Sequence, residues 1–278
     1  MGTELIKRNI NLNKYIWSAS ENINNPELIY NIHKEYINSG ADYITTNTFR
    51  ATPRAYYKYN KSKNYINKAK TSFIKSVEIA KRAAEKSIQT VGSIAPLEDC
   101  YLPQLFPGKK IAYVEFSQLA DWFCNIGVDV IMLETMNSIV ETEIALKALD
   151  NVTMPLWVSF IVKDEYSLLS GDLLINAYEI IKKYNVCKIL FNCANLNITY
   201  NTINNIVNFV DIDWGIYPNL GKGVPASDGV IKKYYSIKKF INIIQHAINN
   251  GASIVGACCG SSPMHINEIY KLKNNNNI

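Results

Sequence analysis

The stretch GVDVIMLET, residues 127–135, contains the unit that decides the fold. Gly127 follows a helical pattern and is placed to end that helix, as Gly40 and Gly251 are at two other positions. The apolar run behind it, residues 129–134, is typical of a buried β-strand and closes on the carboxylate of Glu134. The stretch therefore predicts a helix that ends at a glycine, followed by a buried strand that ends in a polar side chain.

The same unit recurs along the chain. We predict further strands at residues 42–46, 90–95, 156–162, 188–193, 214–217 and 253–257, with helical segments such as 26–39 and 66–87 between them. Such alternation favours an α/β fold in which a parallel sheet closes into a (β/α)₈ TIM-type barrel, with an open doubly wound sheet as the alternative. An eighth strand fits only before residue 42, where strand one is truncated to a stub. We expect a weakened barrel seam near the amino terminus, or an incorrectly assigned start.

Length and composition fit one barrel domain. The chain has 278 residues, of which 48% are hydrophobic and 19% charged, enough for a sizeable core. We predict a single domain over residues 1–273 and a frayed Asn-rich tail over 274–278. The 29 basic and 24 acidic residues are spread along the chain, so the net charge of +5 leaves no electrostatic footprint for nucleic acid.

The sequence also bears on the compartment. No apolar run approaches the roughly 18 residues that span a membrane, and MGTELIKRN at the start lacks the apolar segment of a signal peptide. We expect a cytoplasmic protein without a membrane partner, of unassigned oligomeric state. Its six cysteines should then be reduced, which favours burial, metal binding or chemistry over disulfides.

Reactive side chains gather at the predicted strand ends, which meet at one face of a barrel. Cys193 ends the strand 188–193, and the pair Cys258-Cys259 ends the strand 253–257, one strand further round. Three thiolates can hold Zn²⁺ and leave its fourth position open, which is the layout of a catalytic site. Small buried packing residues are the alternative, and spacing alone does not decide between them. Cys124 and Cys187 are predicted to be packing residues.

Four polar residues are candidates for substrate binding. Glu134 ends an apolar strand, so its carboxylate needs either a substrate ammonium or a neighbouring lysine or arginine. Asn47, Ser93 and Asn219 lie at other strand ends and either line the pocket or tie down their own loops. Asn219 sits between the two strands that carry the cysteines.

The sequence resembles the homocysteine S-methyltransferases over nearly its full length. The matching segments are GTEL, GADYITTNTFRATPRAY, GSIAPLEDCY, GVDVIMLETMNS, PLWVSF, FNCAN, GIYPNLG and GACCG, in the order and spacing of the family. FNC followed by GACCG is the specific part. Family members carry an acid in an Asp-Gly-Gly segment before the counterpart of Gly2, and the sequence lacks it.

The resemblance implies a function and a site. It implies zinc held by Cys193, Cys258 and Cys259, the amino group of homocysteine on Glu134, and Asn219 beside the open zinc position. Asn47 and Ser93 would line the pocket. The expected partners are homocysteine and a sulfonium methyl donor, either S-methylmethionine or S-adenosylmethionine, and the product is methionine.

Three alternatives stay open at this level. The first is a degenerate barrel that binds zinc without turnover, and the second is methylation of another thiol or a selenol. The third is a redox protein using Cys258-Cys259, which is disfavoured because adjacent cysteines form a strained ring and the sequence has no C-x-x-C motif.

Overall fold

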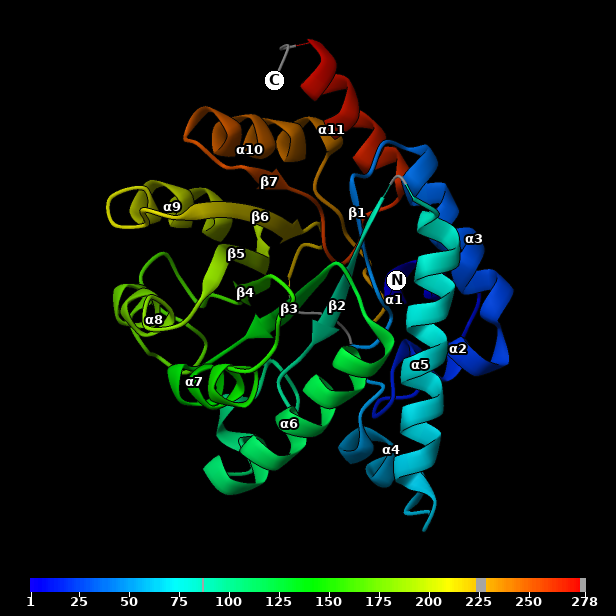
Figure 1. Ribbon diagram of the computed structural model, residues 1–278. Coiled ribbons are helices and arrows are strands. Elements are labelled where there is room, and N and C mark those ends of the chain that lie inside the picture. The colour runs from blue at the N-terminus through cyan, green and yellow to red at the C-terminus, as the bar shows by residue number, and fades with distance from the viewer. Residues whose placement is uncertain (87, 224–228, 276–278) are drawn as a thin grey trace.

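A parallel sheet of seven strands forms the centre of the molecule. The computed structural model describes residues 1–86, 88–223 and 229–275. The strands follow one another round the sheet in chain order and curl like part of a barrel, with the helices outside (Figure 1). They are β1 (Tyr43–Thr45), β2 (Gln89–Ile94), β3 (Val130–Met136), β4 (Leu156–Phe160), β5 (Val186–Asn195), β6 (Asp213–Asn219) and β7 (Ile254–Val255). The predicted strands and the barrel class are confirmed.

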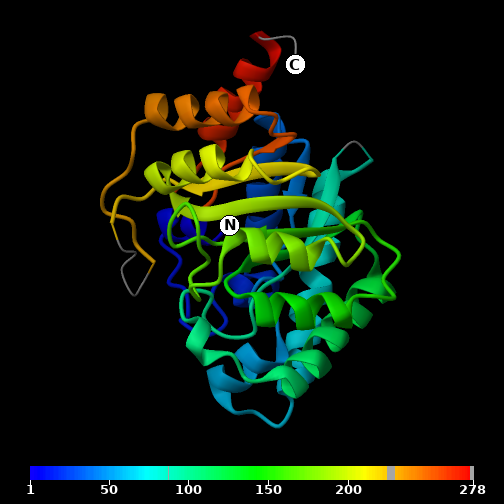
Figure 2. The same cartoon turned by 90° about the vertical axis from the view of Figure 1, so that its left-hand side faces the viewer.

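Helices connect successive strands and cover the outer face of the sheet. In the view turned by 90°, α9 and α10 lie side by side on that face (Figure 2). The helices between and after the strands are α4 (Pro53–Asn60), α5 (Tyr65–Ala84), α6 (Lys109–Ile126), α7 (Ile139–Ala148), α8 (Leu174–Ile181), α9 (Leu196–Ile206), α10 (Ile237–Asn249) and α11 (Pro263–Asn275). Before β1 come α1 (Gly2–Lys7), the 3₁₀ turn η1 (Ser18–Ser20), α2 (Glu21–Asn24) and α3 (Pro26–Asn38); the turn η2 (Pro103–Leu105) precedes α6.

The alternation of side chains along each strand creates two apolar layers. Residues such as Ile131 and Phe191 pack outward against the helices in the main core. Their neighbours Met132 and Leu190 point the other way and join Trp157 in a smaller cluster inside the curl. Because strand side chains alternate between faces, this parity decides which strand-end residues reach the inside of the barrel.

The predicted seam lies between β1 and β7. Each pairs with one neighbour only, β2 and β6 respectively, among the residues that the structure describes. Helices α3 and α11 pack together on this side, where Tyr270 lies against Gly40 and Lys273 pairs with Asp42. The short helix α1 contacts the segment after β7 on this side, where the N–H of Gly260 donates to the Oγ1 of Thr3.

The ends of the elements agree with the sequence in most places. The three predicted capping glycines Gly40, Gly127 and Gly251 all have positive φ, at 97°, 73° and 93°. Helix α11 runs into the predicted tail as far as Asn275, and residues 276–278 of that tail lie outside the described part, as does Ser87 at the end of a predicted helix. Within the described residues, no helix is both long and apolar enough to span a membrane.

Candidate metal centre

Three cysteine sulfurs meet at the carboxyl ends of the strands. The Sγ atom of Cys193 lies 3.3 Å from that of Cys258 and 3.8 Å from that of Cys259. The sulfurs of Cys258 and Cys259 are 3.9 Å apart. All three residues are free cysteines, and together they form the one group of metal-ligand type found among the described residues.

A β-bulge brings Cys193 into this cluster. The pairing of β5 with β6 shifts between Asn192 and Asn195, and Cys193 adopts a left-handed conformation with φ 59°. By strict alternation Cys193 would share the outward face of Ile189 and Phe191. The extra residue of the bulge breaks that alternation, so the sulfur of Cys193 reaches the thiols of Cys258 and Cys259, which follow β7.

The turn that carries Cys258 and Cys259 is bound to the end of β6. The backbone N–H of Cys258 donates to the carbonyl of Pro218 over 2.9 Å, and the N–H of Leu220 donates to the carbonyl of Cys259 over the same distance. These bonds continue the β6–β7 ladder beyond the last residue of β7. The cysteine pair is therefore held by main-chain contacts to a buried strand.

The three thiols share hydrogen bonds and therefore titrate together. Bonds from Cys193 and Cys258 hold the pKa of the Cys259 thiol well below its usual range. The pKa of Cys258 is raised well above the usual value, because its thiol is hydrogen-bonded to Cys193 and Cys259 and is also buried. The hydrogen bonds within the cluster therefore shift the pKa values of Cys258 and Cys259 in opposite directions.

Glu134 lies inside the barrel and is bonded to two hydroxyl groups. Its Oε2 accepts a 2.5 Å hydrogen bond from Ser93, and its Oε1 accepts one of 3.4 Å from Tyr217. Burial raises the pKa of this carboxyl. Among the described residues the partners of Glu134 are these hydroxyls, and no lysine or arginine forms the salt bridge considered from the sequence.

The two asparagines differ in what their amides contact. Asn219 ends β6 with its Nδ2 atom 4.0 Å from the sulfur of Cys193, while its Oδ1 accepts from the N–H of Gly221 over 2.8 Å. The amide of Asn47 is bonded to Ser18 and Asn22, with an Nδ2 to Oδ1 distance of 2.8 Å to Asn22. Asn219 therefore lies at the cysteine cluster, whereas Asn47 fastens the segment before α3.

Two tyrosines at the site have no predicted role. The hydroxyl of Tyr101 lies 3.3 Å from the sulfur of Cys193, and that of Tyr217 contacts Glu134. Charge on Cys193 and burial raise the pKa of Tyr101. Tyr217 belongs to the strand-end segment Tyr217-Pro218-Asn219 and has the inward parity of Asn219, a signal that the sequence does contain. Tyr101 depends on a loop conformation and carries no such signal.

The burial of the remaining three cysteines differs from the prediction. Cys100 is buried, and burial raises the pKa of its thiol to about 12. Cys124 and Cys187 are exposed, so the prediction that they pack in the core is wrong. Cys124 lies on the solvent side of α6, and Cys187 precedes the part of β5 that is covered by helices.

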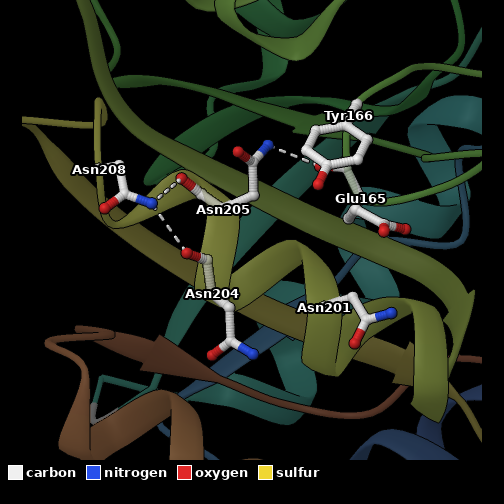
Figure 3. Close-up of a pocket in the computed structure, with 6 residues that line it drawn as sticks. All are labelled: Glu165, Tyr166, Asn201, Asn204, Asn205 and Asn208. Atoms are coloured by element: carbon white, nitrogen blue, oxygen red, sulfur yellow. Dashed lines mark hydrogen bonds between the residues drawn. The ribbon is translucent and has the colours of Figure 1, made fainter.

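A separate polar cavity lies away from the cysteines. Its volume is about 340 Å³, and helix α9 and the segment after β4 form its walls (Figure 3). The side chain of Asn205 bridges the two walls by donating to the carbonyl of Glu165. The lining consists of Glu165, Tyr166, Asn201, Asn204, Asn205 and Asn208. None of the predicted site residues contributes to it.

The fold and the site together define a barrel enzyme with a three-cysteine centre, and comparisons give its family. The family model described as "Homocysteine S-methyltransferase" matches residues 1–272. The chain belongs to the homocysteine S-methyltransferase family.

Relatives agree over the whole chain. Homocysteine S-methyltransferase 2 of Zea mays is 28% identical, covering 99% of this chain and 88% of its own length. Selenocysteine methyltransferase of Astragalus bisulcatus is 26% identical, covering 98% and 90%. The metallated form of the homocysteine methyltransferase MmuM from Escherichia coli superposes with a TM-score of 0.84 over 98% of this chain and 93% of that one. At 24% identity this last likeness establishes the fold alone.

Proposed function

We propose that this enzyme transfers a methyl group from a sulfonium donor to the thiolate of homocysteine, forming methionine, with Zn²⁺ held by Cys193, Cys258 and Cys259. The donor is S-methylmethionine or S-adenosylmethionine. One domain over residues 1–273 would supply the whole site. The spacing of the three sulfurs is the observation that carries this proposal.

The sulfur spacing fits a tetrahedral metal site. Zinc–sulfur bonds of about 2.3 Å in a tetrahedron separate two ligand sulfurs by about 3.8 Å. The observed separations of 3.3, 3.8 and 3.9 Å lie close to that value, whereas a disulfide needs about 2.05 Å. Three thiolates also leave a fourth position for a substrate sulfur, as catalytic zinc sites do.

The residues of the chain supply binding and orientation. When bound, zinc stabilises a coordinated thiol as its thiolate, so no side chain has to act as a general base. Glu134 accepts the ammonium group of homocysteine, which compensates the cost of burying its carboxylate. Ser93 and Tyr217 hold that carboxylate by the two hydrogen bonds described above. Asn219 lies beside Cys193 at the edge of the site.

Asn47 and Ser93 complete the proposed pocket in different ways. The Ser93 hydroxyl orients Glu134 directly. Asn47 shapes the pocket indirectly, because its amide fixes the segment of Ser18 and Asn22 that lies next to the end of β1. The alternative role proposed for such strand-end amides, fastening a loop, is favoured for Asn47.

The transfer itself balances without a further reactant. The homocysteine sulfur forms a bond to the methyl carbon while the bond from that carbon to the donor sulfonium breaks. The electron pair of the broken bond stays on the donor sulfur, which leaves as a neutral thioether. Orientation of the two sulfurs on either side of the methyl carbon is the contribution required of the protein.

A selenol is the second acceptor to consider. The relative from Astragalus bisulcatus is a selenocysteine methyltransferase and is 26% identical to this chain, close to the 28% of the homocysteine enzyme from maize. Selenocysteine also carries an amino group for Glu134 and a soft anionic nucleophile. Parallel assays with homocysteine and selenocysteine would rank the two acceptors by kcat/KM.

Zinc content and methyl transfer should be measured on the same preparation. We expect about one zinc per chain and methionine formation from homocysteine with either donor. Cys258→Ser should lose both, while Cys124→Ser, which alters an exposed cysteine on α6, should keep both. Zinc without turnover for either donor and acceptor would identify a degenerate barrel, and absence of zinc from the wild-type protein would overturn the proposal.

A further inference from the structure

The loop between β2 and α6 is fastened by side chains from other parts of the barrel. Arg50, from the segment after β1, donates to the carbonyls of Pro96 and Glu98 over 3.3 and 2.7 Å. Glu141 of α7 accepts from the N–H of Leu97 over 2.8 Å. These contacts come from both neighbouring βα units, so the loop is held on two sides.

Further bonds act nearer its tip. Asn137, which follows β3, donates to the carbonyl of Cys100 over 3.1 Å. Asp99 accepts from the N–H of Tyr101 over 2.9 Å, which closes a turn directly before the tyrosine. Arg54 of α4 holds the Glu98 carboxylate at 3.1 Å. The main chain on either side of Cys100 is therefore fixed.

This loop delivers one hydroxyl to one sulfur of the cluster. The Tyr101 hydroxyl lies 3.3 Å from the sulfur of Cys193, while the side chain as a whole stays 42% exposed. Among the described residues no comparable hydroxyl contacts Cys258 or Cys259. A phenol donates its proton to a thiolate acceptor, because the thiolate has none to give.

We propose that Tyr101 is a positioning residue for the metal centre, whose hydroxyl donates a hydrogen bond to the Cys193 thiolate and limits the electron density which that sulfur gives to a bound metal. The inference rests on the proposed three-cysteine metal site. Hydrogen bonds to ligand atoms tune metal centres in this way and fix the orientation of the ligand. The fastened loop makes the contact a fixed feature of the site.

Cobalt is the probe that separates this role from a structural one. Co²⁺ bound to thiolates gives a charge-transfer absorption whose energy falls when a hydrogen bond to the sulfur is lost. Tyr101→Phe, which removes only the hydroxyl, should shift this absorption to longer wavelength. Zinc affinity, measured by competition with a chelator, should fall about tenfold, because the sulfur of Cys193 is then less firmly oriented towards the metal. Tyr113→Phe is the matched control, since Tyr113 is 49% exposed on α6 and should leave both quantities unchanged.

Loosening the loop provides a second variant. Arg50→Met removes two bonds to loop carbonyls and should produce a smaller shift in the same direction. If the wild-type protein binds Co²⁺ with a thiolate absorption and both variants show the same spectrum as wild type, the proposal for Tyr101 is wrong and the metal site stands. If the wild-type protein shows no thiolate absorption with Co²⁺, the metal site and the role of Tyr101 fail together.

Discussion

Asn192 donates a 2.8 Å hydrogen bond from its Nδ2 to the Oγ1 of Thr135 and so joins the ends of two strands that are not neighbours. Between them lies β4, whose Ser159 donates to the Oδ1 of Asn192 over 2.7 Å. Thr135 follows Glu134 and Asn192 precedes Cys193, so these buried hydrogen bonds join the residue next to the proposed ammonium anchor with the residue next to a proposed metal ligand.

The backbone is strained at Thr135 and at Cys193, the residue that follows Asn192. Thr135 has φ 63° and Cys193 has φ 59°, and the pairing of each strand shifts there. A β-branched residue at positive φ is an outlier that surrounding contacts must hold in place. We infer that the Asn192 amide is one of those contacts.

Thr135→Val should therefore destabilise the protein and weaken substrate binding. Valine keeps the branched shape but has no acceptor, so the buried amide of Asn192 loses a partner, at a cost of about 1–3 kcal/mol in the free energy of unfolding. We expect a raised KM for homocysteine as Glu134 shifts. Urea unfolding and steady-state kinetics measure the two effects. Thr202→Val is the control, because the Thr202 hydroxyl bonds only within α9; equal losses in both variants would contradict the inference.

The strands and the cysteine cluster could be predicted because each rests on a local pattern. Apolar runs mark the strands, and the ends of parallel strands share one face whatever the loops do. That geometry brings Cys193 to the Cys258-Cys259 turn even though the strands 188–193 and 253–257 were placed only approximately.

The bulge and the tyrosine could not be predicted, because they depend on contacts between distant segments. Strict alternation would turn Cys193 outward, and nothing in FNCAN signals the extra residue of the bulge. Tyr101 reaches the sulfur because Arg50 and Glu141, from other units, fix its loop. Cys124 is predicted to pack in the core because it lies in a helical pattern, but it is exposed on the outer side of α6, a position that the helical pattern alone does not identify.

The free energy of unfolding of Glu141→Gln should increase relative to that of wild type as the pH rises. Burial raises the pKa of the Glu141 carboxyl from 4.5 to about 7. The folded state thus holds the proton more tightly, and wild-type stability is full below 4.5 and falls as the pH rises through about 7. Glutamine stays neutral and keeps an acceptor for the N–H of Leu97. Its advantage should grow by up to about 3 kcal/mol between about pH 4 and about pH 8, as urea midpoints would measure. A difference independent of pH would contradict this.

His33 should make the protein sensitive to acid. It is buried in α3, its Nε2 has no hydrogen-bond partner among the described residues, and burial lowers its pKa from 6.5 to about 3. The folded state favours neutral imidazole, so this contribution is full above 6.5 and is lost as the pH falls towards 3. From about pH 6.5 to about pH 5 the loss should reach about 2 kcal/mol. His33→Leu should lose less stability than wild type over this range in thermal unfolding, whereas His246→Gln, at a half-buried histidine of α10 that is hydrogen-bonded to Asn204, should follow wild type.

Contacts from α1 should determine how firmly the cysteine turn is held. The N–H of Gly260, next to Cys259, donates to the Oγ1 of Thr3 over 3.2 Å, and Lys7 donates to the carbonyl of Ser261 over 3.0 Å. Glu4 is buried and keeps Lys7 in place through an ion pair of 2.8 Å. Helix α1 thus fastens the two residues that follow Cys259.

Thr3→Val removes the acceptor for the N–H of Gly260 while preserving the shape of the side chain. We expect zinc affinity to fall about tenfold, since a ligand whose backbone is less constrained binds less well, with little change in the urea midpoint of the metal-free protein. Thr71→Val, at an exposed threonine of α5, should change neither quantity. Chelator competition would provide the affinities. An unchanged affinity in Thr3→Val would mean that the bonds to β6 suffice to hold Cys258 and Cys259, and that α1 contributes only to the packing of the barrel seam.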